Sequence, residues 1–136
     1  MYSLDNFQQH IDTLTRNDWN RLFQLLPEIE SEDDANKSME EDSLYRIQSK
    51  LLDMIFDLEI NPHFGWSNWD EGIAILKAEN SDYSALDTIT LCKLITTITR
   101  ADRFNEGYMR WCIRNGVFTK LIKALQNKVL DNGTQF

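Results

Sequence analysis

Apolar residues recur along most of the chain at intervals of three and four, which is the period of an amphipathic α-helix. A first helix is predicted over residues 4–14, with Ser3 in position to cap its start. A second is predicted over residues 17–26. Pro27 is expected to end it, because proline lacks an amide hydrogen and clashes with the preceding turn. The short connection between the two segments predicts a helical hairpin.

The widest apolar stripe lies over residues 44–58 and predicts the central helix of the fold. Residues 61–65, with one proline and one glycine, break it. Residues 88–99 are rich in the β-branched side chains that favour strands. Their apolar positions nevertheless fit the helical period, whereas strict alternation would bury Lys93 and Thr97, so a helix is predicted. Further helices are predicted over residues 69–76, 108–113 and 117–125.

These segments predict an all-α fold, a compact bundle of about six to seven short helices without a sheet. The chain has 136 residues, of which 42% are hydrophobic. This is the size of one domain and supplies enough apolar material for a core. We expect the domain to span residues 1–130 and residues 131–136 to form a frayed tail.

The charged residues are distributed unevenly along the chain. There are 22 acidic and 14 basic residues, a formal net charge of −8. Residues 1–87 contain 19 acidic and 6 basic side chains, a net charge of −13, whereas residues 88–136 contain 3 and 8, a net charge of +5. Residues 28–42 hold eight acids and one lysine, which predicts an acidic, solvated loop. If this loop covers the basic helices, the opposite charges largely satisfy each other.

The sequence also bears on the class of protein. No run of apolar residues exceeds four, whereas a membrane helix needs about 20, so no membrane span is expected. No signal sequence is recognisable after Met1, and the expected location is cytoplasmic. Cys92 and Cys112 lack the spacing of a zinc site or a redox pair and are expected in the core. Neither a metal nor a cofactor is therefore expected.

Residues 100–107 form a charged motif, Arg-Ala-Asp-Arg-Phe-Asn-Glu-Gly. The motif follows the leucines of residues 91–95 and precedes Gly116 and the leucines of residues 121–125. This arrangement resembles the R-x-D/E-R-F-x-E-G signature of an uncharacterised family of small bacterial proteins, a domain of unknown function. The resemblance covers roughly residues 66–126. It implies an all-α protein without an assigned activity.

Four side chains of the motif, Arg100, Asp102, Arg103 and Glu106, carry charge at a predicted helix break. In one interpretation they are structural: Asp102 accepts hydrogen bonds from amides of the next helix, and the arginines pair with Glu106 or with carbonyl oxygens. In the other, Arg100 and Arg103 hold a phosphate or carboxylate, and Glu106 is a polar anchor or general base. No nucleophile or phosphate-binding loop accompanies the motif, so the sequence indicates no catalytic residue.

Large aromatic side chains flank the motif. Trp66 and Trp69 lie on either side of a predicted helix start, and Tyr108 and Trp111 lie in the helix after the motif. They are candidates for the lining of a ligand pocket beside the charged residues. As large apolar side chains they equally suit a core position.

Residues 105–128 have the layout of a helix-turn-helix, with Asn115 and Gly116 between two helices and Lys120 and Lys123 on the second. Asn115 is polar where that motif buries an apolar side chain. The net charge of −8 also opposes binding to phosphates. Nucleic-acid binding is therefore the less favoured alternative.

The acidic segment supplies the remaining candidate surface, because a concentrated field of one sign speeds the encounter with a partner of opposite sign. The leading hypothesis is a non-catalytic protein-binding or regulatory module that uses this surface. The alternatives are a small-ligand or enzymatic site around Arg100, Arg103 and Glu106, and nucleic-acid binding through residues 105–128. The acidic residues of the expected docking surface are Glu32, Asp33, Asp34, Glu40 and Glu41.

Overall fold

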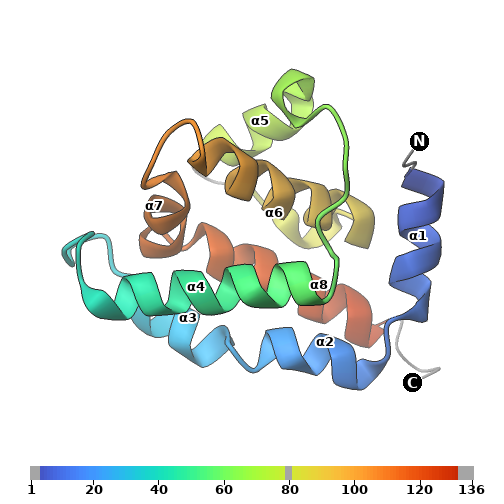
Figure 1. Ribbon diagram of the computed structural model, residues 1–136, viewed down its shortest axis with the longest axis horizontal. Helices are drawn as coiled ribbons and strands as arrows, with labels where there is room; N and C mark the ends of the chain where they lie inside the picture. Colours follow the sequence, from blue (N-terminus) through green and yellow to red (C-terminus); the bar gives the residue numbers. More distant parts are fainter. Residues whose placement is uncertain (1–3, 79–80, 132–136) are drawn as a thin grey trace.

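The computed structural model describes residues 4–78 and 81–131, and its regular elements there are helices joined by short connections (Figure 1). These residues contain no strand, so the predicted all-α class is confirmed. Ser3 and residues 132–136 of the expected tail lie outside the described residues. The helices are α1 (Leu4–Thr13), α2 (Arg16–Phe23), α3 (Leu26–Glu32), α4 (Asp42–Asp57), α5 (Asp70–Lys77), α6 (Thr88–Asp102), α7 (Tyr108–Arg114) and α8 (Val117–Asp131), with 3-10 turns η1 (Trp66–Asn68) and η2 (Tyr83–Ala85).

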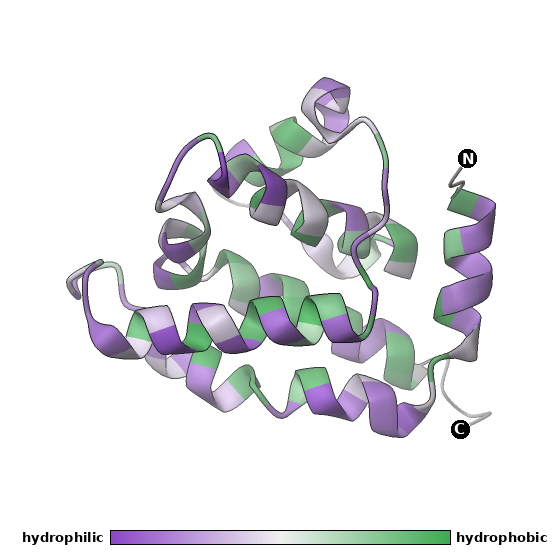
Figure 2. Ribbon diagram, in the orientation of Figure 1, coloured by the Kyte–Doolittle hydropathy of each residue, from purple (hydrophilic) through white to green (hydrophobic). Residues whose placement is uncertain are grey.

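The centre of the bundle is α8 rather than the expected helix of residues 44–58. α8 packs against α2, α3, α6, α7 and η2, and its apolar side chains from Phe118 to Val129 are buried. α4 buries one face through Leu44, Ile47, Leu51 and Ile55 and leaves the other to solvent. Figure 2 accordingly shows apolar and polar positions alternating along α4. A wide apolar stripe thus identified a long helix, but not a central one.

The segment rich in β-branched residues forms α6, as its helical period predicted. Its buried threonines bond within the helix: the Thr96 hydroxyl donates to the Cys92 carbonyl oxygen at 2.8 Å, and the Thr97 hydroxyl to that of Lys93 at 2.8 Å. A threonine side chain can therefore be buried in a helix without leaving its hydroxyl unpaired. This explains why the threonines do not force an extended conformation.

The acidic segment is only partly a loop, and the expectation of a loop from residue 28 onward is wrong. Residues 26–32 form α3, with Pro27 in its first turn, where the missing amide hydrogen costs nothing. Pro27 therefore begins a helix instead of ending one. The irregular part comprises only residues 33–41, which we call the acidic loop.

The acidic and basic parts of the chain are in contact. α3 packs against α7 and α8, and Lys123 Nζ of α8 lies 3.4 Å from Glu30 Oε1 of α3. A second contact between the two parts is buried and is described below. Some of the charge asymmetry of the sequence is therefore neutralised within the fold.

Candidate functional site

The charged motif connects α6 to α7 and fixes the start of α7. Asp102 Oδ1 accepts hydrogen bonds from the backbone N–H groups of Gly107 at 3.1 Å and Met109 at 3.0 Å. Gly107 has a φ of 97°, a left-handed conformation that side-chain-bearing residues rarely adopt. Asp102 therefore has the hydrogen bonds that the structural interpretation of the motif expected for it.

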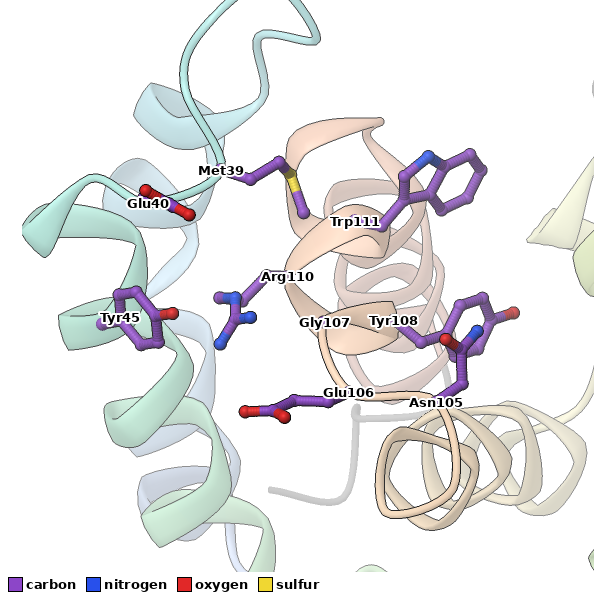
Figure 3. A pocket seen from close by; sticks show the side chains of 9 residues that line it. All are labelled: Met39, Glu40, Tyr45, Asn105, Glu106, Gly107, Tyr108, Arg110 and Trp111. Atoms are coloured by element: carbon purple, nitrogen blue, oxygen red, sulfur yellow. The ribbon is translucent and has the colours of Figure 1, made fainter.

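An open cavity of about 510 Å³ lies over the start of α7, facing the acidic loop and the start of α4 (Figure 3). We call it the α7 groove. One flank carries Tyr45, Glu40, Glu106 and Arg110, and the other carries Tyr108 and Trp111. The remaining lining residues are Met39, Asn105 and Gly107. Gly107 lies between the two flanks and has no side chain there.

Arg110 is the charged centre of the first flank. Its guanidinium carbon lies 4.2 Å from the centroid of the Tyr45 ring, a cation–π contact. Its Nε is buried without a hydrogen-bond partner. Within the described part of the chain its guanidinium forms no ion pair. An unsatisfied buried donor of this kind is unusual in a folded protein, so Arg110 keeps an unused hydrogen-bond donor beside the groove.

The second flank of the α7 groove is aromatic. Tyr108 and Trp111 are stacked, with centroids 6.3 Å apart and planes inclined by 12°. Trp111 is 49% exposed, and Tyr45 across the groove is 43% exposed. Burial raises the pKa of the Tyr108 hydroxyl, so the ring is neutral at physiological pH. Large half-exposed aromatic rings are typical of protein-binding surfaces.

A second cavity of about 260 Å³ adjoins the first, because Asn105 and Tyr108 line both. We call it the α6 pocket. Its other walls come from α5, α6 and Trp66, with Lys77 as the one charged lining residue, and its surface is mainly apolar. Trp66 also contacts the ring of Phe104, with centroids 6.0 Å apart, and Phe104 is 82% exposed. Aromatic side chains thus extend from one cavity to the other.

Arg100 and Arg103 do not take the place that the ligand hypothesis gave them. Neither lines the α7 groove, although Glu106 does. Neither forms an ion pair with Glu106 or any other acid among residues 4–78 and 81–131. Arg103 is exposed and Arg100 is half-buried. The cation beside Glu106 in the groove is Arg110.

Trp69 lies apart from both cavities and has a packing role. Its ring meets Phe64 edge-on with centroids 5.5 Å apart, and Lys93 Nζ lies 4.2 Å from its centroid. A Cβ placed on Gly72 would come within 2.2 Å of the Trp69 ring, so this close contact requires glycine. Of the four aromatic candidates, the structure brings Tyr108 and Trp111 to the α7 groove and Trp66 with Tyr108 to the α6 pocket.

The acidic loop is held by Arg114 at the end of α7, in an arrangement that we call the Arg114 clamp. The guanidinium of Arg114 is 1% exposed and donates five hydrogen bonds, which matches its five N–H groups. Two go to Glu32, at 2.7 Å to Oε1 and 3.0 Å to the carbonyl oxygen. Two go to the Ser38 carbonyl oxygen at 2.8 and 3.2 Å, and one to Glu41 Oε2 at 3.1 Å.

The clamp changes the composition of the expected docking surface. Glu32 is buried and accepts a further hydrogen bond from the Ser43 hydroxyl at 3.0 Å, so its assignment to the surface is wrong. Glu41 is half-buried and bound to Arg114. Asp33 and Glu40 are exposed and Asp34 is half-buried, and Glu40 lines the α7 groove. The part of the acidic surface that remains accessible therefore borders the groove.

The two helices of residues 105–128 do form a hairpin, with Gly116 between them at a φ of 79°. α8 is enclosed by neighbouring helices, and Thr119 is buried in it. Its exposed side chains include Lys120, Lys123 and Asn127, and Lys123 is already paired with Glu30. One of the two exposed lysines of α8 is therefore already neutralised within the fold.

Sequence reasoning missed four residues that define the region: Met39, Tyr45, Arg110 and Arg114. Tyr45 lies on the polar side of the amphipathic α4, and an aromatic residue at such a position was an available signal. Arg114 follows an apolar stretch one helical turn after Arg110, with no local sign that one is buried and the other is not. The acids that hold Arg114 lie 73 and 82 residues earlier in the chain.

The two cysteine thiols are inaccessible. Both thiols are buried; burial raises the pKa of Cys112 to about 12 and that of Cys92 further. A thiol with such a pKa is a poor nucleophile at neutral pH. Among the described residues, no cluster of three or more histidine, cysteine or acidic side chains is placed to hold a metal ion. No helix in the same residues has the length and apolar character needed to cross a membrane.

Comparison with known proteins identifies a family but no function. No curated protein and no solved structure matches the chain. A family model described as a family of unknown function, DUF6508, matches residues 14–130. The match extends well beyond residues 66–126, where the sequence motif suggested membership of an uncharacterised family. The chain belongs to the family of unknown function DUF6508.

Proposed function

We propose that this protein is a non-catalytic protein-binding module, and that it binds a segment of its partner in the α7 groove. The observation that carries the proposal is Arg110, an arginine with a buried, unpartnered Nε, in an open cavity between the half-exposed rings of Tyr45 and Trp111. Tryptophan, tyrosine and arginine are the residues that contribute most to binding energy at protein interfaces. Here all three surround one cavity.

The accessible acids support the same site. Asp33, Asp34 and Glu40 lie in the acidic loop, whose end forms one wall of the groove. Long-range attraction by such charges raises the association rate more than it lowers the dissociation rate. A basic partner is therefore drawn toward the groove itself and not to a separate surface.

A peptide selection tests the proposal directly. The full-length protein is used to select from a displayed library of random peptides, and the recovered peptides are measured against the Trp111→Ala and Phe56→Ala variants. Phe56 is a matched control, because it is 48% exposed on α4 and does not line the groove. We expect Trp111→Ala to weaken binding by about tenfold or more, as for a central interface tryptophan, and Phe56→Ala to leave it unchanged.

The opposite results contradict the proposal. Equal binding to both variants would place the peptide site outside the α7 groove. Recovery of no specific peptide would argue against a peptide-binding module. The ligand-binding alternative would be favoured by a different result: a small anionic molecule binds, its binding is lost in an Arg110 variant, and no selected peptide competes with it.

A further inference from the structure

The α7 groove and the α6 pocket together describe what a partner must carry. We propose that they are two subsites of one binding surface, which takes a partner segment with a basic side chain for the α7 groove and an apolar side chain for the α6 pocket. This inference rests on the proposed function, because it specifies the partner of the same site. The basic residue is an arginine or lysine, and the apolar one is aromatic or a large aliphatic.

The charge of the α7 groove favours a basic side chain. Its charged lining consists of Glu40, Glu106 and Arg110, so acids outnumber bases. Arg110 is already placed on the Tyr45 ring, which partly compensates its charge. An incoming carboxylate would meet two like charges and one cation, whereas an incoming guanidinium or ammonium meets two carboxylates and one like charge, that of Arg110. Residues 33–42 on the same side contain five acids and one lysine, which adds to the attraction for a cation.

The α6 pocket has the opposite character. It is smaller, about 260 Å³, and its walls include Ile73, Leu76, Ala101 and the rings of Trp66 and Tyr108. Such a cavity suits an apolar side chain, whose transfer from water is favourable in proportion to the area it buries. Lys77 is its only charged lining residue, so the cavity gives a second cation no partner.

The two cavities are joined in a way that lets one segment reach both. Asn105 and Tyr108 line both cavities, so the two cavities adjoin and these two residues form the boundary between them. Gly107, at the start of α7, adds no side chain to the α7 groove next to Tyr108 (Figure 3). The exposed Phe104, in contact with Trp66, extends the apolar surface beside the α6 pocket. Because the two cavities adjoin, we expect one short peptide to reach both subsites.

The first test determines which residues are enriched in the peptides selected on the protein, and whether changing the charge of the α7 groove changes them. With the wild-type protein we expect recovered peptides to share one basic and one apolar position at a fixed spacing. The Glu40→Lys and Glu106→Lys double variant should select an acidic residue in place of the basic one and keep the apolar position. The Asp12→Lys and Asp53→Lys double variant, with the same change in net charge at exposed positions of α1 and α4, should select the original pattern.

The second test examines the α6 pocket. Ala101→Leu narrows this pocket and should reduce the preference at the apolar position while the basic position is retained. As a measurement that needs no variant, the four tryptophan indole N–H signals are followed by NMR during titration with a selected peptide. We expect the signals of Trp66 and Trp111 to shift, and those of Trp19, which is buried, and Trp69, which packs on Gly72, to stay in place.

These outcomes separate the inference from the proposed function. Peptides that depend on Trp111 but shift only its indole signal, or that show no apolar position, would overturn the two-subsite inference and leave the binding module standing. A basic position that survives the Glu40→Lys and Glu106→Lys change would overturn the assigned partner charge. Failure to recover any peptide that depends on Trp111 would contradict the proposed function itself.

Discussion

Arg110 and Arg114 lie one helical turn apart on α7, and their surroundings differ completely. Arg114 is buried and uses all five N–H groups on the carbonyl and carboxylate oxygens of the acidic loop and α3. Arg110 rests on one tyrosine ring, has a buried Nε without a partner and lines an open cavity. The first is fully explained by the fold, whereas the second is not.

The contrast separates structural charge from charge that is available for binding. A buried guanidinium must be paired, because its desolvation costs several kcal/mol. The Arg114 clamp meets this need and uses up part of the acidic surface in doing so. The groove beside it keeps an unsatisfied arginine and two accessible carboxylates, Glu40 and Glu106. Binding is therefore expected at Arg110 and stability at Arg114.

Replacement of Arg114 should have the largest effect on stability. Arg114→Met leaves the Glu32 carboxylate buried without its cation, and we expect the free energy of unfolding to fall by about 3 to 5 kcal/mol. Urea unfolding followed by circular dichroism measures this. The Glu32→Gln and Arg114→Met double variant should be more stable than Arg114→Met alone, because it leaves no unpaired charge. A loss of less than about 1 kcal/mol in Arg114→Met would show that the clamp contributes little.

Replacement of Arg110 should affect peptide binding strongly and stability only slightly. In Arg110→Met the cation–π contact with Tyr45 is lost, but no ion pair within the described residues is broken. We expect the free energy of unfolding to change by less than about 1 kcal/mol, and the affinity for peptides selected on the wild-type protein to fall by about tenfold. Arg46→Met, an exposed position on α4 with the same loss of charge, is the control. A destabilisation as large as that of Arg114→Met would remove the distinction between the two arginines.

Cys112 lies midway between the two arginines in the chain. Its replacement should have a smaller effect on the free energy of unfolding, which is seen only at high pH. Burial raises the pKa of this thiol from 9.0 to about 12, so the folded state holds the proton where the unfolded state releases it. Its contribution to stability is complete below pH 9 and is lost as the pH rises toward 12. Cys112→Ala should therefore show a weaker decline in unfolding free energy between pH 9 and 11 than the wild-type protein. An identical decline in both proteins would contradict the assigned burial.

The sequence predicted the helical class because each helix carries its own periodic pattern. The pattern was sufficient even for α6, where β-branched residues argued for a strand. It failed at α3, because a helix with Glu28, Glu30 and Glu32 reads as a solvated loop unless the buried Ile29 and the partner of Glu32 are known. The local sequence pattern predicts the period of a helix. It does not predict which charged side chains of that helix are buried and paired by a residue far away in the chain.

The candidate site was predictable only in part, for the same reason. Glu106, Tyr108 and Trp111 were identified from the charged motif and its aromatic neighbours, and all three line the α7 groove. One of the two interpretations of the motif placed Arg100 and Arg103 at a ligand site with Glu106, but the turn at Gly107 places α7, and hence Arg110, beside Glu106. Three further lining residues, Met39, Glu40 and Tyr45, lie more than 60 residues before Glu106 in the chain.

The Arg114 clamp also has a consequence for the order in which the chain folds. Its hydrogen bonds join residues separated by 73 to 82 positions, so they form only after α7 has docked between segments from both halves of the chain. Closing a loop of that length costs chain entropy before other contacts offset it, so we expect the clamp to form after the folding barrier. Interactions made after the barrier govern the rate of unfolding and leave the rate of folding nearly unchanged. Loss of the clamp is therefore expected to shorten the lifetime of the folded state by speeding unfolding, with little effect on the rate of folding.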